Sequence, residues 1–84
     1  MLLDMSGLDH IVTLATAYGS HEGVENSTVS WRVFGDSKKL DAIIGGADLQ
    51  VTRYERALSW FSANWPEGLD WPLAVPRPSQ EAAA

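Results

Sequence analysis

Two glycines, Gly23 and Gly35, enclose the stretch that most restricts how this chain can fold. Glycine tolerates the positive φ that a tight turn requires, and a glycine placed after a helix readily adopts the left-handed conformation that ends it. Small polar residues follow the first glycine and favour a helix start, because their side-chain oxygens accept hydrogen bonds from a first helical turn. Val29 and Val33 are then spaced to face a preceding helix. We therefore expect a turn at Gly23 and a short helix from Thr28 to Phe34.

A turn and a short helix that packs across its predecessor form the second half of a helix-turn-helix. The side chains left on the outside of this segment are polar or aromatic, and such side chains can touch base edges and phosphates. They are Asn26, Ser27, Ser30, Trp31 and Arg32. The sequence therefore predicts a small DNA-binding domain in which this helix lies in the major groove.

The chain length of 84 residues allows one domain with a modest core, too small for a two-domain enzyme with a deep cleft. A small core is marginally stable, and a homodimer would bury additional surface.

The sequence has no cysteine, which excludes disulfides and thiolate metal sites and suits a reducing compartment. No apolar stretch approaches the length needed to cross a bilayer, so we expect a cytoplasmic protein.

Motifs for catalysis or for a cofactor are missing from the sequence. His10 and His21 with Glu22 lack the spacing of a closed metal site, and surface or capping positions are expected for them. There is no nucleophile elbow, phosphate loop or dinucleotide fingerprint. We expect neither an enzyme nor a bound cofactor or metal.

The net charge of −5 argues against a nucleic-acid binder, but the charges are unevenly distributed. Five of the six basic residues lie between Ser27 and Leu58, against four acidic residues there, whereas the rest of the chain carries one basic and seven acidic residues. The five are Arg32, Lys38, Lys39, Arg53 and Arg56. We expect them to face DNA, the last four holding phosphates, although an ordinary solvated surface has the same appearance. So few cations bind DNA weakly unless two copies act together.

Ahead of the glycine turn, hydrophobic periodicity predicts a helix from about Leu8 to Tyr18, after a frayed lead-in. Its apolar positions, spaced for one face, are Leu8, Ile11, Val12, Ala15 and Tyr18. Residues 18–23 either end this helix, or form the last part of the helix that packs under the segment from Thr28 to Phe34.

After Gly35, Asp36 and Ser37 are expected to cap a short helix from Lys38 to Ile44. The pair Gly45–Gly46 stops this helix, and residues 47–51 form a connector.

The last helix has the clearest start signal. Thr52 and Glu55 have the spacing of a capping box, in which each side chain satisfies a free N–H group of the other residue's backbone. We expect the helix to run to about Asn64, because Pro66 disfavours helical backbone at the residue before it. The inward stripe comprises Tyr54, Ala57, Leu58, Phe61 and Trp65. Trp60 lies off this stripe, which indicates a second contact surface.

All four prolines and two of the four tryptophans follow this helix, so the backbone there is expected to be extended. One placement lays this arm across the last helix, with Trp71 and Leu73 inserted in the chain's own core. The other is a swapped arm that grips a second subunit, with a dimer interface of Trp60, Phe61, Trp65 and Trp71. The domain spans residues 1–78, and residues 79–84 are expected to be disordered.

Part of this stretch resembles the turn and recognition helix of lac-repressor-type and related phage-repressor helix-turn-helix families. The matching residues are the pair Gly23-Val24, the triplet Thr28-Val29-Ser30 and Val33. The resemblance covers roughly a dozen residues. It implies that Asn26, Ser27 and Trp31 face bases and that Thr28 and Ser30 face phosphates.

Upstream of the turn the match is partial. Those families place a small residue where Gly19 stands, and an apolar residue where this chain has Glu22. Where they most often place a guanine-reading arginine, this chain has Trp31, with Arg32 one position later. The segment from Trp60 to Pro66 also resembles a group of short bacterial proteins, but this second resemblance implies no function.

The sequence thus predicts an all-α bundle of about four short helices with a helix-turn-helix and a Trp/Pro-rich arm. The expected function is that of a homodimeric DNA-binding transcriptional regulator, a repressor. The alternative is an acidic protein-interaction module, an anti-activator or adaptor that docks on another regulatory protein through its aromatic surface. A positive face around Arg32 and Lys38 favours DNA, and an acidic face there favours a protein partner.

Overall fold

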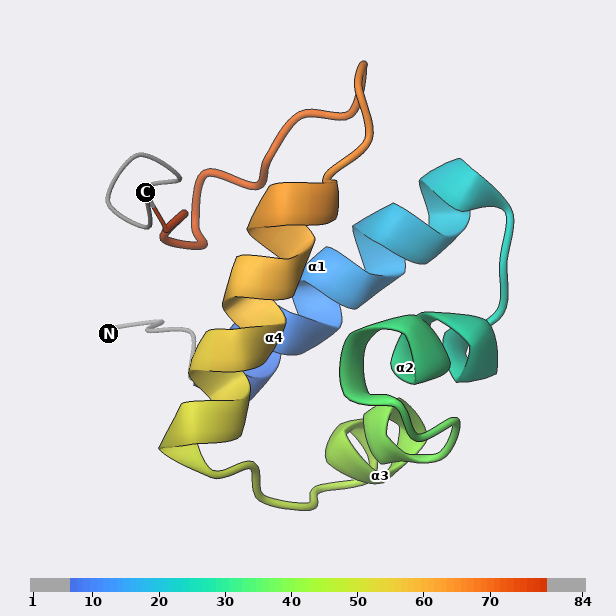
Figure 1. The fold of residues 1–84 in the computed structure, drawn as a ribbon, viewed down its shortest axis with the longest axis vertical. Coiled ribbons are helices and arrows are strands. Elements are labelled where there is room, and N and C mark those ends of the chain that lie inside the picture. The colour runs from blue at the N-terminus through green and yellow to red at the C-terminus, as the bar shows by residue number, and fades with distance from the viewer. Residues whose placement is uncertain (1–6, 79–84) are drawn as a thin grey trace, which may run out of the picture.

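The computed structural model describes residues 7–78, and within this range every regular element is a helix. The helices are α1 (Gly7–Glu22), α2 (Asn26–Phe34), α3 (Lys39–Ile44) and α4 (Val51–Asn64). Helices α1 and α4 cross one another, and α2 and α3 pack together beside them (Figure 1). The predicted small all-α bundle is confirmed. The predictions for the N-terminal lead-in and for residues 79–84 concern segments outside the described residues, apart from Gly7, which opens α1.

The hydrophobic core lies where the four helices meet the C-terminal segment. Its members are Ile11, Leu14, Ala15, Tyr18, Val29, Leu40, Ala57, Leu58, Phe61 and Val75. In α1 the buried face follows helical spacing, as predicted for Ile11, Ala15 and Tyr18. Leu14 also belongs to this face, whereas the predicted Leu8 and Val12 are only partly buried. The predicted stripe of α4 is confirmed at its three buried members and is partly exposed at Tyr54 and Trp65.

The second helix ends as the sequence predicts. Gly35 has φ 71°, and its backbone N–H donates to the carbonyl oxygen of Trp31 at 2.8 Å. In this left-handed conformation glycine avoids the strain that a side chain would introduce. The start of α2 is two residues earlier than predicted, at Asn26.

Helix α3 begins at Lys39, one residue later than predicted. The carboxylate of Asp36 accepts a hydrogen bond from the backbone N–H of Lys38 at 2.8 Å, so it stabilises the turn before the helix instead of capping its first turn. The helix ends at Ile44, and the N–H of Gly45 donates to the carbonyl oxygen of Asp41 at 2.9 Å.

The predicted capping box of Thr52 and Glu55 is wrong. The box requires Thr52 as the N-cap, but helix α4 begins at Val51. Its N-cap is Gln50, two residues before Thr52, and the Gln50 side chain makes no capping hydrogen bond. Thr52 therefore already lies inside the first turn, where it is not in the N-cap position that the box requires. The predicted end at Asn64 is confirmed.

The segment after α4 folds back on its own chain (Figure 1). The indole N–H of Trp65 donates to the carbonyl oxygen of Leu69, and that of Trp71 donates to the carbonyl oxygen of Val75. Val75 is buried in the core, whereas Leu73, one of the two predicted core residues of this arm, is fully exposed. The arm contains two turns, in which the backbone N–H of Leu69 donates to the carbonyl oxygen of Pro66 and that of Val75 donates to the carbonyl oxygen of Pro72. Val75, at the end of the second turn, faces inward.

Arg77 fastens the end of this segment to α4. Its guanidinium lies 4.8 Å from the ring centre of Trp71 and donates hydrogen bonds to the Oγ and carbonyl oxygen of Ser62 at 3.2 and 3.0 Å. These contacts hold the arm in place against α4 (Figure 1).

Candidate nucleic-acid interface

The turn between α1 and α2 has the conformation that the sequence predicts. Gly23 has φ 70°, and the backbone N–H of Val24 donates to the carbonyl oxygen of Gly19 at 3.0 Å. Helix α1 continues to Glu22, beyond its predicted end at Tyr18, so residues 19–22 form its last turn. The two helices are therefore joined by three residues only, which restricts how α2 can be oriented.

A close contact at Gly19 fixes α2 against α1. A Cβ atom on Gly19 would lie 3.2 Å from the carbonyl oxygen of Val24 and 3.3 Å from Cγ2 of Val29. Both distances are tighter than ordinary van der Waals contact, so the absence of a side chain allows the helix, the turn and α2 to approach one another. This is the position at which the resemblance in sequence calls for a small residue.

With Val29 packed inward, α2 presents one uncovered face. Ser27 and Trp31 are four residues apart and share the outer side of the helix, with Thr28 and Arg32 next to them. Trp31 is 62% exposed. Asn26 is exposed at the first position of the helix. The residues predicted to face bases, Asn26, Ser27 and Trp31, thus all lie on the surface.

The prediction that Ser30 contacts DNA is wrong. Its side chain is fully buried, and its hydroxyl donates to the carbonyl oxygen of Asp36 and accepts a hydrogen bond from the backbone N–H of Leu40. A hydroxyl is small enough to enter the core when both its donor and its acceptor functions are satisfied there. Ser30 therefore joins α2 to α3 and cannot reach a phosphate.

Arg32 is exposed but held at its tip. One guanidinium nitrogen donates to the Tyr18 hydroxyl at 2.9 Å and lies 3.9 Å from a carboxylate oxygen of Glu22. Tyr18 is the residue that the sequence did not indicate as part of this surface. The Arg32 guanidinium is thus held in position beside α2, and its contact with Glu22 is a long, solvent-exposed ion pair.

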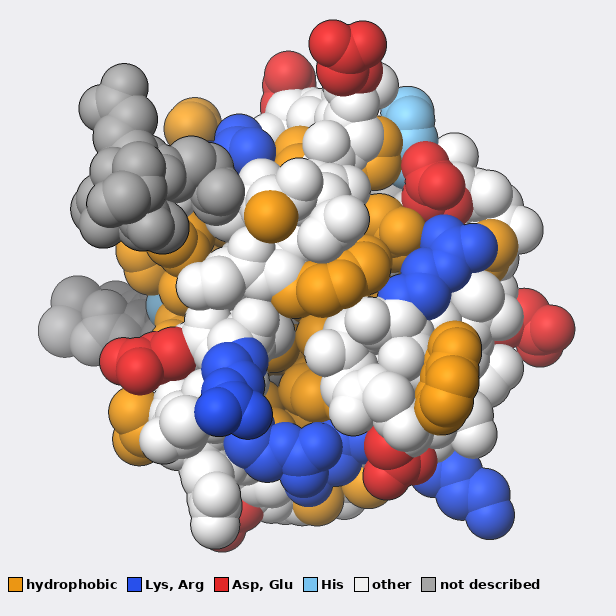
Figure 2. Space-filling view, in the orientation of Figure 1, with side chains coloured by type: hydrophobic (Ala, Val, Ile, Leu, Met, Phe, Trp, Pro, Cys, Tyr) orange, Lys and Arg blue, Asp and Glu red, His pale blue; other side chains and the backbone are white. Residues whose placement is uncertain are grey.

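The other four predicted phosphate contacts have no acidic partner among the described residues. Within residues 7–78 the Arg32–Glu22 contact is the only ion pair within 4.0 Å, so none of these four side chains lies that close to a carboxylate oxygen. They are Lys38, Lys39, Arg53 and Arg56, of which Lys39 is partly buried. Figure 2 shows Lys and Arg side chains over the first half of α4 and toward α3, on the side of the molecule that also displays α2. Basic side chains over α3 and α4 therefore lie on the side of the molecule that displays α2.

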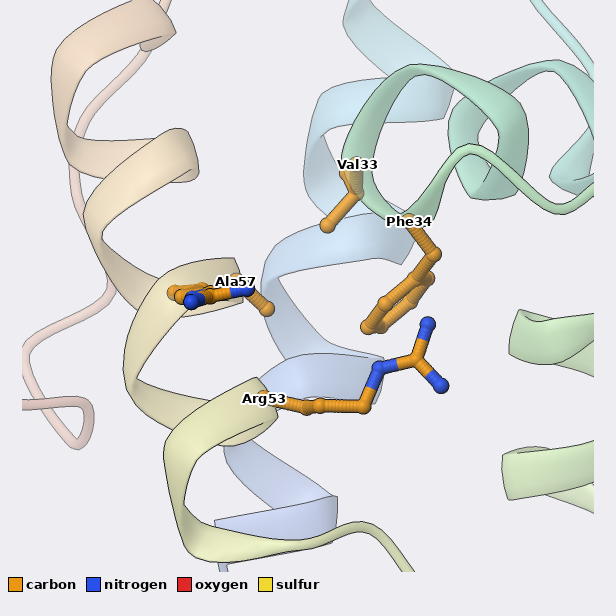
Figure 3. Close-up of a pocket in the computed structure, with 5 residues that line it drawn as sticks. Val33, Phe34, Arg53 and Ala57 are labelled. Carbon is orange, nitrogen blue, oxygen red and sulfur yellow. The ribbon is translucent and has the colours of Figure 1, made fainter.

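Arg53 and Arg56 line a small pocket between α4 and the end of α2, with a volume of about 150 Å³. The guanidinium of Arg53 lies 5.9 Å from the ring centre of Phe34, toward which it points in Figure 3. Val33 and Ala57 complete the lining. The aromatic ring holds one arginine in an extended conformation without neutralising it. Phe34 was predicted only as an apolar helix residue, because nothing in sequence links it to α4.

The predicted dimer interface is wrong for Phe61, which is fully buried within its own chain. Trp60 packs edge-on against Phe61 and Tyr18, each with ring centres 5.5 Å apart, so it belongs to the core cluster and not to a separate surface. Trp65 and Trp71, with ring centres 4.9 Å apart, extend this cluster under the arm. These three tryptophans are partly exposed, and a role for them in dimerisation stays a prediction.

Tyr54 is the titratable residue with a perturbed environment. Its hydroxyl lies 3.1 Å from Nδ1 of His10, which gives that histidine a partner within the fold. Burial raises the pKa of the Tyr54 phenol above its ordinary value of 10.0, and the nearby charge of Glu55 raises it further.

Residues 7–78 contain neither a metal-binding cluster nor a helix suited to crossing a membrane. No cluster of three or more His, Asp or Glu side chains is arranged to hold a metal ion there. None of the four helices combines the length and apolarity that crossing a membrane requires.

No protein-family model, curated protein or solved structure matches this chain.

Proposed function

We propose that this protein is a DNA-binding transcriptional regulator that inserts α2 into the major groove of double-stranded DNA. The observation that carries the proposal is the uncovered face of α2, held at a fixed angle by the contact of Gly19 with Val24 and Val29. A rigid helix with short polar side chains and one aromatic residue on its outer face has the dimensions and chemistry that a major groove accepts.

The residues divide into two sets. Asn26, Ser27 and Trp31 face bases, and Thr28, partly buried at the start of α2, lies toward a phosphate. The phosphate-holding cations are Arg32, Lys38, Lys39, Arg53 and Arg56. Because the last four have no acidic partner among the described residues, their charge is available to the DNA backbone.

The pocket of Arg53 and Arg56 supplies the firmest of these backbone contacts. Two guanidinium groups one helical turn apart offer several N–H donors to a single phosphate, and the Phe34 ring limits the movement of Arg53. Contacts of this kind set the orientation of α2 in the groove without reading sequence.

A homodimer is part of the proposal. Five cations per chain provide modest affinity, and two linked copies combine their contacts on adjacent half-sites.

Repression, the predicted outcome of such binding, follows if the occupied site overlaps a promoter. A cytoplasmic location is likewise proposed, since the chain lacks cysteine and needs access to DNA.

The test is selection of binding sites from a pool of random duplex DNA, followed by measurement of Kd for the selected duplex at several salt concentrations. The proposal predicts enrichment of a common motif, tighter binding to it than to a scrambled duplex, and a Kd that rises steeply with salt. The double variant Arg53→Gln and Arg56→Gln should bind both duplexes more weakly. A pool that stays random after several rounds, with no salt-dependent binding, would contradict the proposal.

A protein partner is the second possibility, and the exposure of Trp31 together with the net charge of −5 favours it. Tryptophan is common at the centre of protein interfaces. The selection experiment discriminates between the two, since a protein-interaction module enriches no DNA motif.

A further inference from the structure

Trp31 differs from every other tryptophan of the chain. Trp60, Trp65 and Trp71 each pack against other aromatic rings. The side chain of Trp31 has neither a ring contact nor a hydrogen-bond partner among residues 7–78, and most of the residue's surface is exposed. A large aromatic side chain held in water on a short polar helix face indicates a contact with something outside the chain.

Trp31 is the side chain in this part of α2 that can approach the floor of a DNA groove, because its two neighbours in sequence are engaged within the fold. Ser30 is buried in the core, and Arg32 is bound to Tyr18 and lies beside Glu22. Ser27, one helical turn earlier, shares the outer side of α2 but has a short side chain. Trp31 therefore reaches furthest from this face.

The chemistry of the indole ring selects one base. The ring offers a broad apolar surface and a single N–H donor, with no acceptor. In the major groove thymine presents the C5-methyl group beside the O4 acceptor, whereas cytosine presents a donor, guanine two acceptors and adenine an acceptor with a donor. The thymine edge is the one that combines an apolar group with an acceptor and no donor.

We infer that Trp31 reads a thymine by packing its ring against the C5-methyl group, an inference that rests on the proposed DNA binding. DNA is favoured over a protein as the occupant of this face because Lys and Arg side chains gather on the side of the molecule that also displays α2 (Figure 2), and four of the basic residues have no acidic partner within the described residues. Trp31 is thus assigned as a specificity-determining residue, and the remaining contacts position the duplex.

The experiment removes one methyl group at a time. In the duplex selected with the wild-type protein, each thymine is replaced in turn by deoxyuridine, which lacks only the C5-methyl group and keeps the O4 acceptor. We expect one thymine in each half-site at which the replacement weakens wild-type binding about fourfold, the effect of leaving about one methyl group unburied. Replacements at thymines outside the contact should leave Kd unchanged.

Two variants assign the effect to the side chain. Trp31→Ala should bind the selected duplex more weakly and be insensitive to the same replacement. Ile44→Ala, which shortens an exposed apolar residue of α3, is the matched control and should keep the wild-type sensitivity. Both positions are exposed, so neither variant removes a core residue.

Three results would overturn the inference. Tight, salt-dependent binding with no methyl-sensitive thymine would remove the role of Trp31 and leave the proposed function intact. The same holds if Trp31→Ala retains the wild-type sensitivity. If no duplex is selected and binding shows no dependence on salt, the proposed function fails and the assignment of Trp31 fails with it, and a protein partner becomes the occupant of this face.

Discussion

The Oγ atom of Ser30 lies 2.9 Å from the backbone nitrogen of Leu40 and accepts its hydrogen bond inside the core. The same hydroxyl donates to the carbonyl oxygen of Asp36, so one side chain satisfies two backbone groups between α2 and α3. The hydroxyl of Ser30 is therefore buried without being left as an unpaired polar group.

Replacing Ser30 with alanine should lower the free energy of unfolding by about 1–3 kcal/mol, because the N–H of Leu40 and the carbonyl of Asp36 both lose a buried partner. Urea denaturation followed by circular dichroism measures this loss. Ser27→Ala, on the exposed side of the same helix, should change stability by less than about 0.5 kcal/mol. Equal effects of the two substitutions would mean that the Ser30 hydroxyl is not satisfied as described.

Gly19→Val tests how closely α1 and α2 approach. The new side chain meets the carbonyl oxygen of Val24 and the Val29 side chain, and such overpacking costs about 1–3 kcal/mol of stability. The variant should also bind the selected duplex more weakly, since α2 is displaced from its angle. Ser20→Val, at an exposed neighbouring position of α1, is the control and should leave both properties nearly unchanged. A fully stable Gly19→Val protein would show that no close contact exists there.

Val75 and Leu73 form a matched pair for the C-terminal arm. Val75→Ala removes two buried methyl groups and should destabilise the protein by about 1–3 kcal/mol. Leu73→Ala removes exposed atoms and should have almost no effect on a thermal melt. The reverse order would place Leu73 in the core, as the sequence had suggested.

Arg32→Ala should weaken binding to the selected duplex and reduce the slope of log Kd against log salt concentration by about one unit, if Arg32 contacts a phosphate. Fluorescence anisotropy over a range of salt concentrations gives both quantities. Arg77→Gln alters an arginine held at the arm by Ser62 and Trp71, and its slope should equal that of the wild type. An unchanged affinity for Arg32→Ala would remove this residue from the site.

Stability should fall in alkaline solution because of Tyr54. Since the pKa of its phenol is raised in the folded protein above its usual value of 10.0, the unfolded chain releases this proton at lower pH than the folded chain. The folded state then binds more protons than the unfolded state above about pH 10, so raising the pH through that range favours unfolding. Denaturation curves at increasing pH should show a smaller decline for Tyr54→Phe than for the wild type. Identical declines would show that Tyr54 is not responsible.

The sequence alone predicts those features that depend on local chemistry. Glycine at positions 23 and 35 marks a turn and a helix end because few other residues adopt positive φ, and both are found there. The end of α4 near Pro66 follows from the same kind of local restriction. The exposure of Trp31 also follows, since it lies opposite the buried Val29 on a helix.

Features that depend on contacts between distant residues were predicted poorly. Ser30 has a side chain typical of surfaces, and only the position of α3 shows that its hydroxyl finds two partners in the core. The choice of Val75 over Leu73 depends on turns in the arm that the proline spacing does not determine. The capping box at Thr52 matches the sequence pattern, but the chain enters helical conformation two residues earlier than the box requires.

If the outer face of α2 binds DNA, as proposed, the indole N–H signals of the four tryptophans report the binding directly. In a ¹⁵N NMR titration with the selected duplex, the signal of Trp31 should shift and broaden. Those of Trp65 and Trp71, whose N–H groups are bonded to Leu69 and Val75 at the arm, should stay in place. A titration that shifts the arm tryptophans and leaves Trp31 unchanged would contradict the claim.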